Sequence, residues 1–318
     1  MYMFKYILKR IGLMLMTFMI IFLMCFVLIK LLPINIDIQF GKDYEALVKK
    51  LELRGYYDPI PEQFIRYLRR IFLDGDFGIG VNIYKEKSAW TIFTSKLPPT
   101  VLLNIYSSLF AVPLGIALGI IAALKKNKVI DHVISTGVMI FISVPSFVYA
   151  SLVLYIFCFK LNWFPKTMKS GTNYFSFEMF KSMIPAVISL SFGSIAGYAR
   201  YTRAELTEVL TSEFMLLART KGLTKSQATL RHALRNSMVP IFPSIIGEFI
   251  SVLSGSLIIE SIFGVPGVGG LYLEAINKKD YDFFMLLSAF YTLVGLAAGL
   301  VIDLSYGIID PRIRMGAK

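Results

Sequence analysis

The chain has 318 residues, of which 56% are hydrophobic and 17% charged, and its formal net charge is +12. Soluble domains have about 45–50% apolar and about 25% charged residues, so this composition excludes an ordinary soluble protein. Basic residues separate apolar blocks, as on the cytoplasmic loops of membrane proteins. They form no basic face of the kind that binds nucleic acid.

The first apolar block predicts a retained membrane span. Lys5, Lys9 and Arg10 precede an apolar run at 11–32. A secretory signal peptide has a shorter apolar core and a cleavage site of small residues. This run instead ends in bulky side chains, so we expect it to remain in the membrane.

Further apolar blocks predict an all-α fold, an integral membrane bundle of six transmembrane helices. Each block approaches the roughly 20 residues that a crossing requires. The fourth block is short and holds Pro185, Gly193 and Gly197. Small residues let helices approach closely, so we expect this span to be central. The six predicted spans are 11–32, 101–124, 133–159, 183–199, 241–263 and 283–305.

The distribution of basic residues predicts the orientation. Positive charge gathers before the first span, between the second and third, between the fourth and fifth, and after the sixth. With six spans these four segments share one side, so we expect a multi-pass cell-membrane protein with both termini in the cytoplasm. The basic residues are Lys5, Lys9, Arg10, Lys125, Lys126, Lys128, Arg200, Arg203, Arg219, Lys221, Lys225, Arg231, Arg235, Arg312, Arg314 and Lys318.

The chain divides into three parts by this pattern. Residues 1–32 form the N-terminal segment and first span, 33–98 an extracytoplasmic cap, and 99–318 a core of five spans. The cap is expected to be ordered, because Asp58-Pro59-Ile60-Pro61 predicts a helix start. Helically spaced apolar residues follow it: Phe64, Ile65, Leu68, Ile71 and Phe72. The core includes a cytoplasmic loop at 200–236 and an outer loop at 264–282.

The segment from Thr207 to Asn236 predicts a rigid helical elbow. A helix over Glu208–Lys221 is followed by Gly222, which suits a left-handed C-cap. Thr224 to Gln227 then reads as a capping box that opens a second helix after a one-residue hinge. Such a helix suits docking in a groove of a partner protein. An amphipathic helix in the headgroups is the alternative; a DNA-reading motif is disfavoured because both ends are tethered to spans.

Two motifs in the elbow resemble a known family. Ala218-Arg219-Thr220-Lys221-Gly222-Leu223 and then Arg231-His232-Ala233-Leu234-Arg235-Asn236 resemble the loop of ABC importer permeases of the dipeptide, oligopeptide and nickel type. The resemblance implies ATPase contacts from one group of residues: Ala218, Arg219, Lys221, Gly222 and Leu223. It implies that His232, Arg235 and Asn236 fix the second helix.

The resemblance extends along the chain. Asp58-Pro59, the glycine-rich run from Phe263 to Leu271 and Asp310-Pro311-Arg312 are similar to family segments. The chain departs from the family at Pro33-Ile34-Asn35-Ile36, where an acidic turn is frequent, and at Gly270, where arginine is frequent. The long first outer loop suggests the first permease of a pair.

The resemblance also implies the partners and the cargo. We expect a second permease subunit, two cytoplasmic ATPase subunits, an extracytoplasmic solute-binding protein and membrane lipid, with no nucleic acid. The chain would form half of a path for peptides, nickel or a metal chelate. No G-x-x-x-x-G-K-[ST] sequence is present, so ATP would be hydrolysed by the partners and the chain itself is expected to be no enzyme and to hold no cofactor.

Three acidic residues fall in the predicted spans: Glu248, Glu260 and Asp303. Buried membrane charges tend to face a bundle interior or a cavity, although Glu260 and Asp303 lie close enough to the two membrane faces to meet headgroup water. Glu248 either lines a cationic path or pairs with Arg200 or Arg203. Glu248, Ser251 and Ser254 recur at three-residue spacing, which predicts a path-lining face or, alternatively, serines that meet another helix.

Two other functions were weighed against the importer. An ion-coupled secondary transporter would use Glu248 or Asp303 as a proton relay, but such carriers often show internal repeats and none is visible. An intramembrane hydrolase is disfavoured because the two histidines, His132 and His232, both lie at the cytoplasmic edge. The cysteines, Cys25 and Cys158, lie in apolar runs as packing residues. We therefore predict no catalytic and no metal site.

Overall fold

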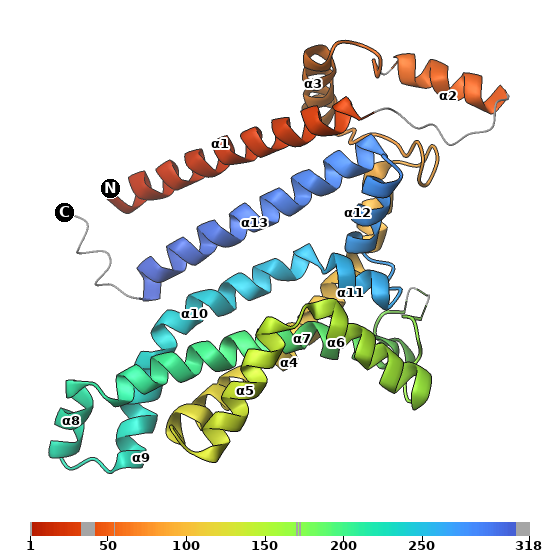
Figure 1. Cartoon of the computed structure of the whole chain (residues 1–318). Helices are drawn as coiled ribbons and strands as arrows, with labels where there is room; N and C mark the ends of the chain where they lie inside the picture. The colour runs from red at the N-terminus through yellow and green to blue at the C-terminus, as the bar shows by residue number, and fades with distance from the viewer. Residues whose placement is uncertain (1, 33–41, 54, 170, 172, 310–318) are drawn as a thin grey trace. The chain divides into compact units, whose positions relative to one another are not determined.

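The computed structural model describes residues 2–32, 42–53, 55–169, 171 and 173–309, and this part is helical without a strand (Figure 1). The all-α prediction is therefore confirmed. Pro33–Ile36, where the chain departs from the family, and the family-like segment Asp310–Arg312 lie outside the described residues. Proximity of Cα atoms divides the chain into two compact units: residues 1–98 with 267–296, and residues 99–266 with 297–318.

The first unit combines the first span with a small helical cap. Residues 267–296 belong to this unit, although they follow the core helices in sequence. Its elements are α1 (Tyr2–Leu31), α2 (Lys42–Leu53), α3 (Ile60–Arg69), the π-helical turn η1 (Arg70–Asp74), the start of α4 (Ala89–Leu124), α12 (Val268–Asn277) and the first part of α13 (Tyr281–Ile309).

The predicted helix start in the cap is confirmed. Pro59 immediately precedes α3, and Pro61 lies in its first turn, where the missing N–H of proline costs no hydrogen bond. Phe64, Leu68 and Ile71 pack against the core of the unit. Ile65 and Phe72 do not, and their side chains stay exposed. The helix α2 was not predicted from the sequence.

The second unit holds the remaining helices. They are the rest of α4, α5 (Val129–Ser143), α6 (Ser146–Val153), the π-helix η2 (Leu154–Lys160), α7 (Phe177–Leu210), α8 (Glu213–Thr220), α9 (Lys225–Ala228), the π-helix η3 (Thr229–Ala233), α10 (Leu234–Ser251), the 3₁₀ turn η4 (Val252–Ser254), α11 (Leu257–Ile262) and the end of α13.

Five of the described helices are long and apolar enough to cross a membrane, and a bent pair brings the number to six. The pair is the predicted third span, which breaks after Ser143 and turns by 104°. The prediction of one continuous helix at 133–159 was therefore wrong. Val144 has an extended backbone because the ring of Pro145 disfavours a helical conformation in the residue before it.

The fifth predicted span, 241–263, also has different limits. The helix begins at Leu234 and ends near Ser254, where Gly255 adopts a positive φ of 63°. Glycine takes this conformation without steric cost, so the chain turns and α11 starts as a separate short helix. Glu260 therefore lies on α11 and not on the spanning helix.

The weak fourth span is confirmed as a central helix. α7 has 34 residues and contacts α5, α6, α10 and α11 within the second unit. Its closest approach uses glycines of α4, not its own: a Cβ on Gly115 would lie 2.8 Å from the Ile195 carbonyl, and one on Gly119 would lie 2.6 Å from Thr202. Two small residues four apart are a recurring way to bring membrane helices together.

Candidate functional site: the elbow and its supports

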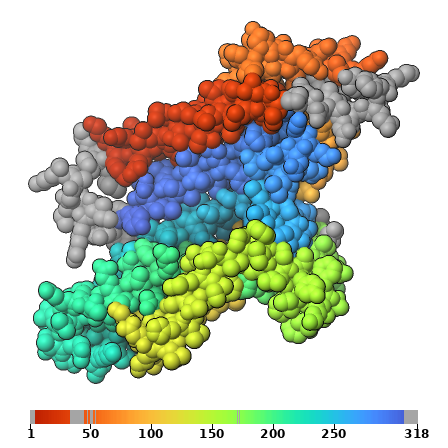
Figure 2. All heavy atoms as spheres, in the orientation of Figure 1, coloured from red at the N-terminus to blue at the C-terminus, as the bar shows by residue number. Residues whose placement is uncertain are grey.

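The elbow between α7 and α10 forms one end of the second unit, where α8 and α9 lie side by side (Figure 1). Its atoms make a continuous block in the space-filling view (Figure 2). The expected helix over Glu208–Lys221 is wrong, because the chain breaks at Thr211 and Ser212 before α8 begins. The hydroxyl groups of both residues donate to carbonyls of the last turn of α7, which competes with helix continuation.

The predicted caps of the elbow are confirmed. Gly222 has a φ of 91°, and the N–H of Leu223 donates to the carbonyl of Ala218 at 3.4 Å. The capping box is complete: Gln227 N–H donates to Thr224 Oγ1 at 3.3 Å, and Thr224 N–H donates to Gln227 Oε1 at 3.1 Å. The connection between α8 and α9 covers Lys221 to Thr224 and is thus longer than the predicted one-residue hinge.

A small apolar core anchors the elbow. Buried side chains from α4, α7, α8, α9 and η3 meet there: Ala123, Leu206, Met215, Ala228 and Ala233. Ala218 and Leu223, which the resemblance assigned to ATPase contact, are half-buried against this core. The other six predicted coupling residues are exposed: Arg219, Lys221, Gly222, His232, Arg235 and Asn236.

The outer side of α8 carries apolar residues that the sequence prediction did not select. Leu216 and Leu217 are 61% and 56% exposed. Met215 and Ala218, three residues apart and hence on one side of the helix, face the core, so the two leucines lie on the other side. Glu213 and Arg219 flank them at the two ends of α8. The result is a short helix fixed on one side with an apolar strip on the other.

A buried ion pair supports the helix that leads into the elbow. Arg203 of α7 donates to Asp131 of α5 through Nε at 2.6 Å and Nη2 at 2.8 Å. Asp131 is buried and also accepts from the N–H of Asn127 at 2.9 Å. This pair was not predicted, because the two residues are far apart in sequence. Of the alternatives for Glu248, pairing with Arg203 is wrong, since Arg203 pairs with Asp131.

The three candidate path residues lie at the end of α10 and in η4. Glu248 is half-buried, and its Oε1 accepts a hydrogen bond from Ser194 of α7 at 2.8 Å. Ser251 is exposed and donates to its own helix at the carbonyl of Gly247. Ser254 falls in the 3₁₀ turn beyond the α-helix, so the regular three-residue spacing ends before it.

Glu260 is fully buried and accepts a hydrogen bond from Thr100 Oγ1 at 2.9 Å. The expectation that it reaches headgroup water is wrong. A Cβ on Gly255 would lie 2.4 Å from its Oε1, so the glycine at this turn also makes room for the carboxylate.

In the first unit, two aspartates at the start of α13 organise residues 79–83 of the cap. Asp280 Oδ2 accepts hydrogen bonds from three consecutive backbone N–H groups, those of Val81, Asn82 and Ile83, at 2.8–3.0 Å. Asp282 accepts from the N–H of Ile79 at 3.0 Å. Burial raises the pKa of Asp280 to about 6, against the opposing effect of the three N–H donors.

The fold and the elbow define the class of protein: a multi-pass helical membrane protein with a capped elbow between two spans. Residues 115–315 match the family of binding-protein-dependent transport system inner membrane components. The chain belongs to this family, which confirms the predicted ABC importer permease class and a multi-pass location in the membrane.

Three comparisons illustrate the likeness. The dipeptide transport system permease protein DppB of Bacillus subtilis is 32% identical and aligns over 99% of each chain. The oligopeptide transport system permease protein OppB of Escherichia coli is 35% identical over 81% of each chain. A chain of the inward-facing MetNI methionine ABC transporter superposes with a TM-score of 0.50, covering 68% of this chain and 97% of that one, at 14% identity. That last likeness concerns the fold alone.

Proposed function

We propose that this chain forms half of the translocation path of an importer for dipeptides or oligopeptides, and that α8 couples it to a separate ATPase. The cargo is supported by relatives named as peptide permeases, including DppB of Lactococcus lactis at 33% identity over 98% of this chain. Nickel and metal chelates have no support among these relatives and are not part of the proposal.

The coupling role rests on the apolar strip of α8. An exposed pair of leucines on a helix whose opposite side is anchored is suited to a hydrophobic groove. Exposed contiguous apolar residues at a membrane-protein loop also favour a protein partner over water. The partners proposed are a second permease, two ATPase subunits and a solute-binding protein, with the elbow and both termini in the cytoplasm. The chain itself would hydrolyse nothing.

The path role is proposed for Glu248, Ser251 and Ser254. It is supported by the position of Glu248 inside the second unit, where its carboxylate meets only a neutral hydroxyl partner at 2.8 Å among the contacts described. A carboxylate held in a bundle without an adjacent cation is available to a cationic group of a passing peptide.

Reconstitution tests the coupling proposal. The chain with its partners is placed in liposomes, and ATP hydrolysis and peptide uptake are measured for the wild type and for Leu217→Asp. We expect the variant to insert normally but to lose most peptide-stimulated hydrolysis. Leu124→Asp is the matched control, because Leu124 is a 46% exposed leucine at the end of α4, outside the elbow. Equal activity of Leu217→Asp and wild type contradicts the coupling role.

The same preparation separates the importer from an ion-coupled carrier. Uptake that continues in the absence of ATPase subunits, driven by a proton gradient, contradicts the importer. Peptide uptake that stops when ATP is omitted, in whichever variant is used, supports the importer.

A further inference from the structure

Helix α3 and the turn η1 carry apolar side chains that no described core covers. Ile65, Phe72 and Leu73 are 67%, 75% and 69% exposed. Ile65 lies on α3, and Phe72 and Leu73 lie on the π-helical turn that continues it. An exposed apolar side of this kind marks an interaction surface.

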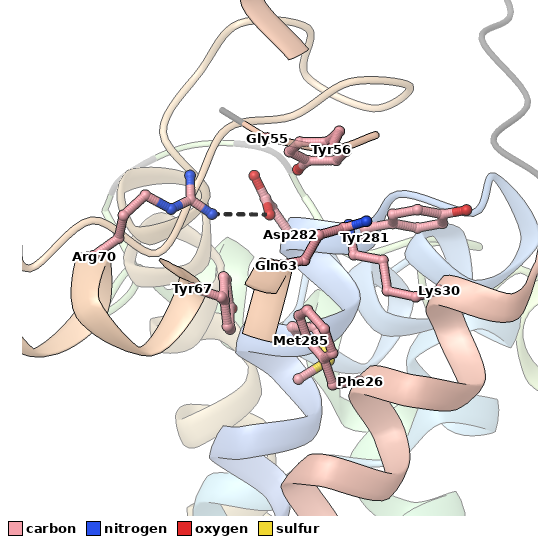
Figure 3. A pocket seen from close by; sticks show the side chains of 10 residues that line it. All are labelled: Phe26, Lys30, Gly55, Tyr56, Gln63, Tyr67, Arg70, Tyr281, Asp282 and Met285. Atoms are coloured by element: carbon pink, nitrogen blue, oxygen red, sulfur yellow. Dashed lines mark ion pairs between the residues drawn. The ribbon is translucent and has the colours of Figure 1, made fainter. Parts of the chain in front are cut away.

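A neighbouring side of α3 packs on α1 and α13 within the first unit. Phe64 lies with its ring 5.1 Å from that of Phe26, and Tyr67 lies 6.0 Å from Phe22. Met285 of α13 belongs to the same buried cluster. Figure 3 shows side chains of all three helices around one pocket, with Tyr67 beside Phe26 and Met285.

These contacts fix the depth of α3. Phe26 and Phe22 lie five and nine residues before the end of α1, which is about 8 and 14 Å along its axis. A hydrocarbon leaflet is about 15 Å thick. α1 is a membrane span with a mean hydropathy of 2.8. The inner side of α3 therefore packs on a part of α1 that lies in the bilayer.

Aromatic and basic side chains near the end of α1 indicate that this level is the boundary between acyl chains and headgroups. Lys30 near the end of α1 places Nζ 4.0 Å from the ring of Tyr56 and 4.5 Å from that of Tyr281. Tyrosines and a lysine at the end of a span are typical of the boundary between acyl chains and headgroups.

The polar residues of α3 occupy a separate sector. Glu62, Arg66 and Arg69 are exposed, and Arg66 pairs with Asp58. At positions i, i+4 and i+7 they share one side of α3, and Ile65 lies between that side and the core side formed by Phe64 and Leu68. α1 exposes Met24 and Leu28 at the same level, so the span presents apolar side chains outward at the depth of α3.

We infer that α3 and η1 form an interfacial helix immersed in the leaflet around the last turns of α1, with Ile65, Phe72 and Leu73 among the acyl chains. The basic residues Arg66 and Arg69 lie at the headgroups, where anionic lipid attracts them. The cap is thus membrane-bound along one side and does not stand free in water.

Spin labelling tests this inference. A nitroxide is attached at Ile65→Cys or Phe72→Cys, in a chain with Cys25→Ser and Cys158→Ser, in the assembled complex in nanodiscs that contain phosphatidylglycerol. Collision with oxygen is expected to exceed collision with a water-soluble nickel reagent severalfold at both positions. The matched controls Glu62→Cys and Arg66→Cys, on the polar sector of the same helix, should show the reverse.

Two outcomes contradict the inference. Free access of the nickel reagent at positions 65 and 72 means that this side lies in water. Shielding from both reagents means that a protein subunit covers it. Where the cysteine-free background fails to fold, Phe72→Trp and Arg66→Trp in the native chain replace the labels, and stronger quenching by brominated lipid is required at position 72.

Discussion

The guanidinium of Arg203 holds the carboxylate of Asp131 through two hydrogen bonds, from Nε at 2.6 Å and Nη2 at 2.8 Å. Arg203 lies one turn before Leu206, a fully buried residue of the elbow core. Asp131 lies at the start of α5, the first half of the broken span. This pair therefore ties the broken span to the helix that leads into the elbow, and such bidentate pairs fix orientation as well as distance.

Breaking this pair should destabilise the chain. We expect Asp131→Asn and Arg203→Gln each to cost about 1–3 kcal/mol, because either change leaves a charge without its partner, while the partial exposure of Arg203 reduces the cost. Thermal unfolding in nanodiscs measures the loss of stability. The double variant should lose less free energy of unfolding than the sum of the losses of the two single variants. Strict additivity would show that the pair is not coupled. Ser135→Ala, which removes only a 3.2 Å hydrogen bond to Asp131, is the control.

The close packing of α4 on α7 predicts an intolerant glycine. In Gly119→Ala the new Cβ would lie 2.6 Å from Thr202 and 2.7 Å from the Ala199 carbonyl, so the helices must separate at a cost of about 1–3 kcal/mol. Gly197→Ala is the matched control, since a Cβ there meets nothing within 4 Å. It should be neutral or stabilising by up to about 1 kcal/mol. Equal melting temperatures of the two variants would contradict the packing.

The buried carboxylate of Asp280 predicts a dependence of stability on pH. Its pKa in the folded chain is about 6, above the value of about 3.9 in an unfolded chain. The folded state thus binds a proton more tightly, so the contribution of Asp280 to stability is fully present below pH 4 and is lost as the pH rises through 6. Relative to Asp280→Asn, the wild type should gain up to about 3 kcal/mol between pH 8 and pH 4.

Thermal unfolding of both proteins across this pH range provides the measurement. Asp74→Asn, which removes an exposed carboxylate from the same unit, controls for the loss of one charge. A difference between wild type and Asp280→Asn that does not vary with pH would refute the assignment.

The left-handed conformation of Gly222 predicts a graded loss of coupling. The position has space for a side chain, but a φ of 91° strains any residue except glycine. Asparagine tolerates this region better than a β-branched residue, so Gly222→Asn should retain more peptide-stimulated ATP hydrolysis than Gly222→Val. Gly222→Pro should abolish it while membrane insertion persists. Full activity of the valine variant would exclude a rigid elbow.

The path proposal is tested by Glu248→Gln. The amide oxygen still accepts the hydrogen bond from Ser194, so folding should be retained while the charge is lost. We expect uptake of cationic peptides to fall several-fold relative to neutral ones, in liposomes with the partner subunits present. Unchanged uptake of every peptide would remove Glu248 from the path.

Several local features could be predicted because neighbouring residues determine them. Gly222, Thr224 and Gln227 specify their cap and capping box through hydrogen bonds that span only a few residues. Pro59 and Pro61 also mark the start of α3 locally, because proline fits the first turn of a helix but not its interior. Length and hydropathy then suffice for the number of spans but not for the break in the third or the limits of the fifth. The elbow motif suffices for the class of protein.

The sequence by itself therefore determined the helical class, the number of spans and the caps of the elbow. Only the tertiary structure decided which elbow residues face inward, because Ala218 and Leu223 are covered by distant residues such as Ala123. It also paired Arg203 with Asp131 and buried Glu260 against Thr100. Such contacts depend on how separate helices approach one another, and helical periodicity identifies an apolar side without saying which surface will cover it. Neighbouring residues thus specify the caps of the elbow, whereas contacts with distant helices decide which of its sides is exposed.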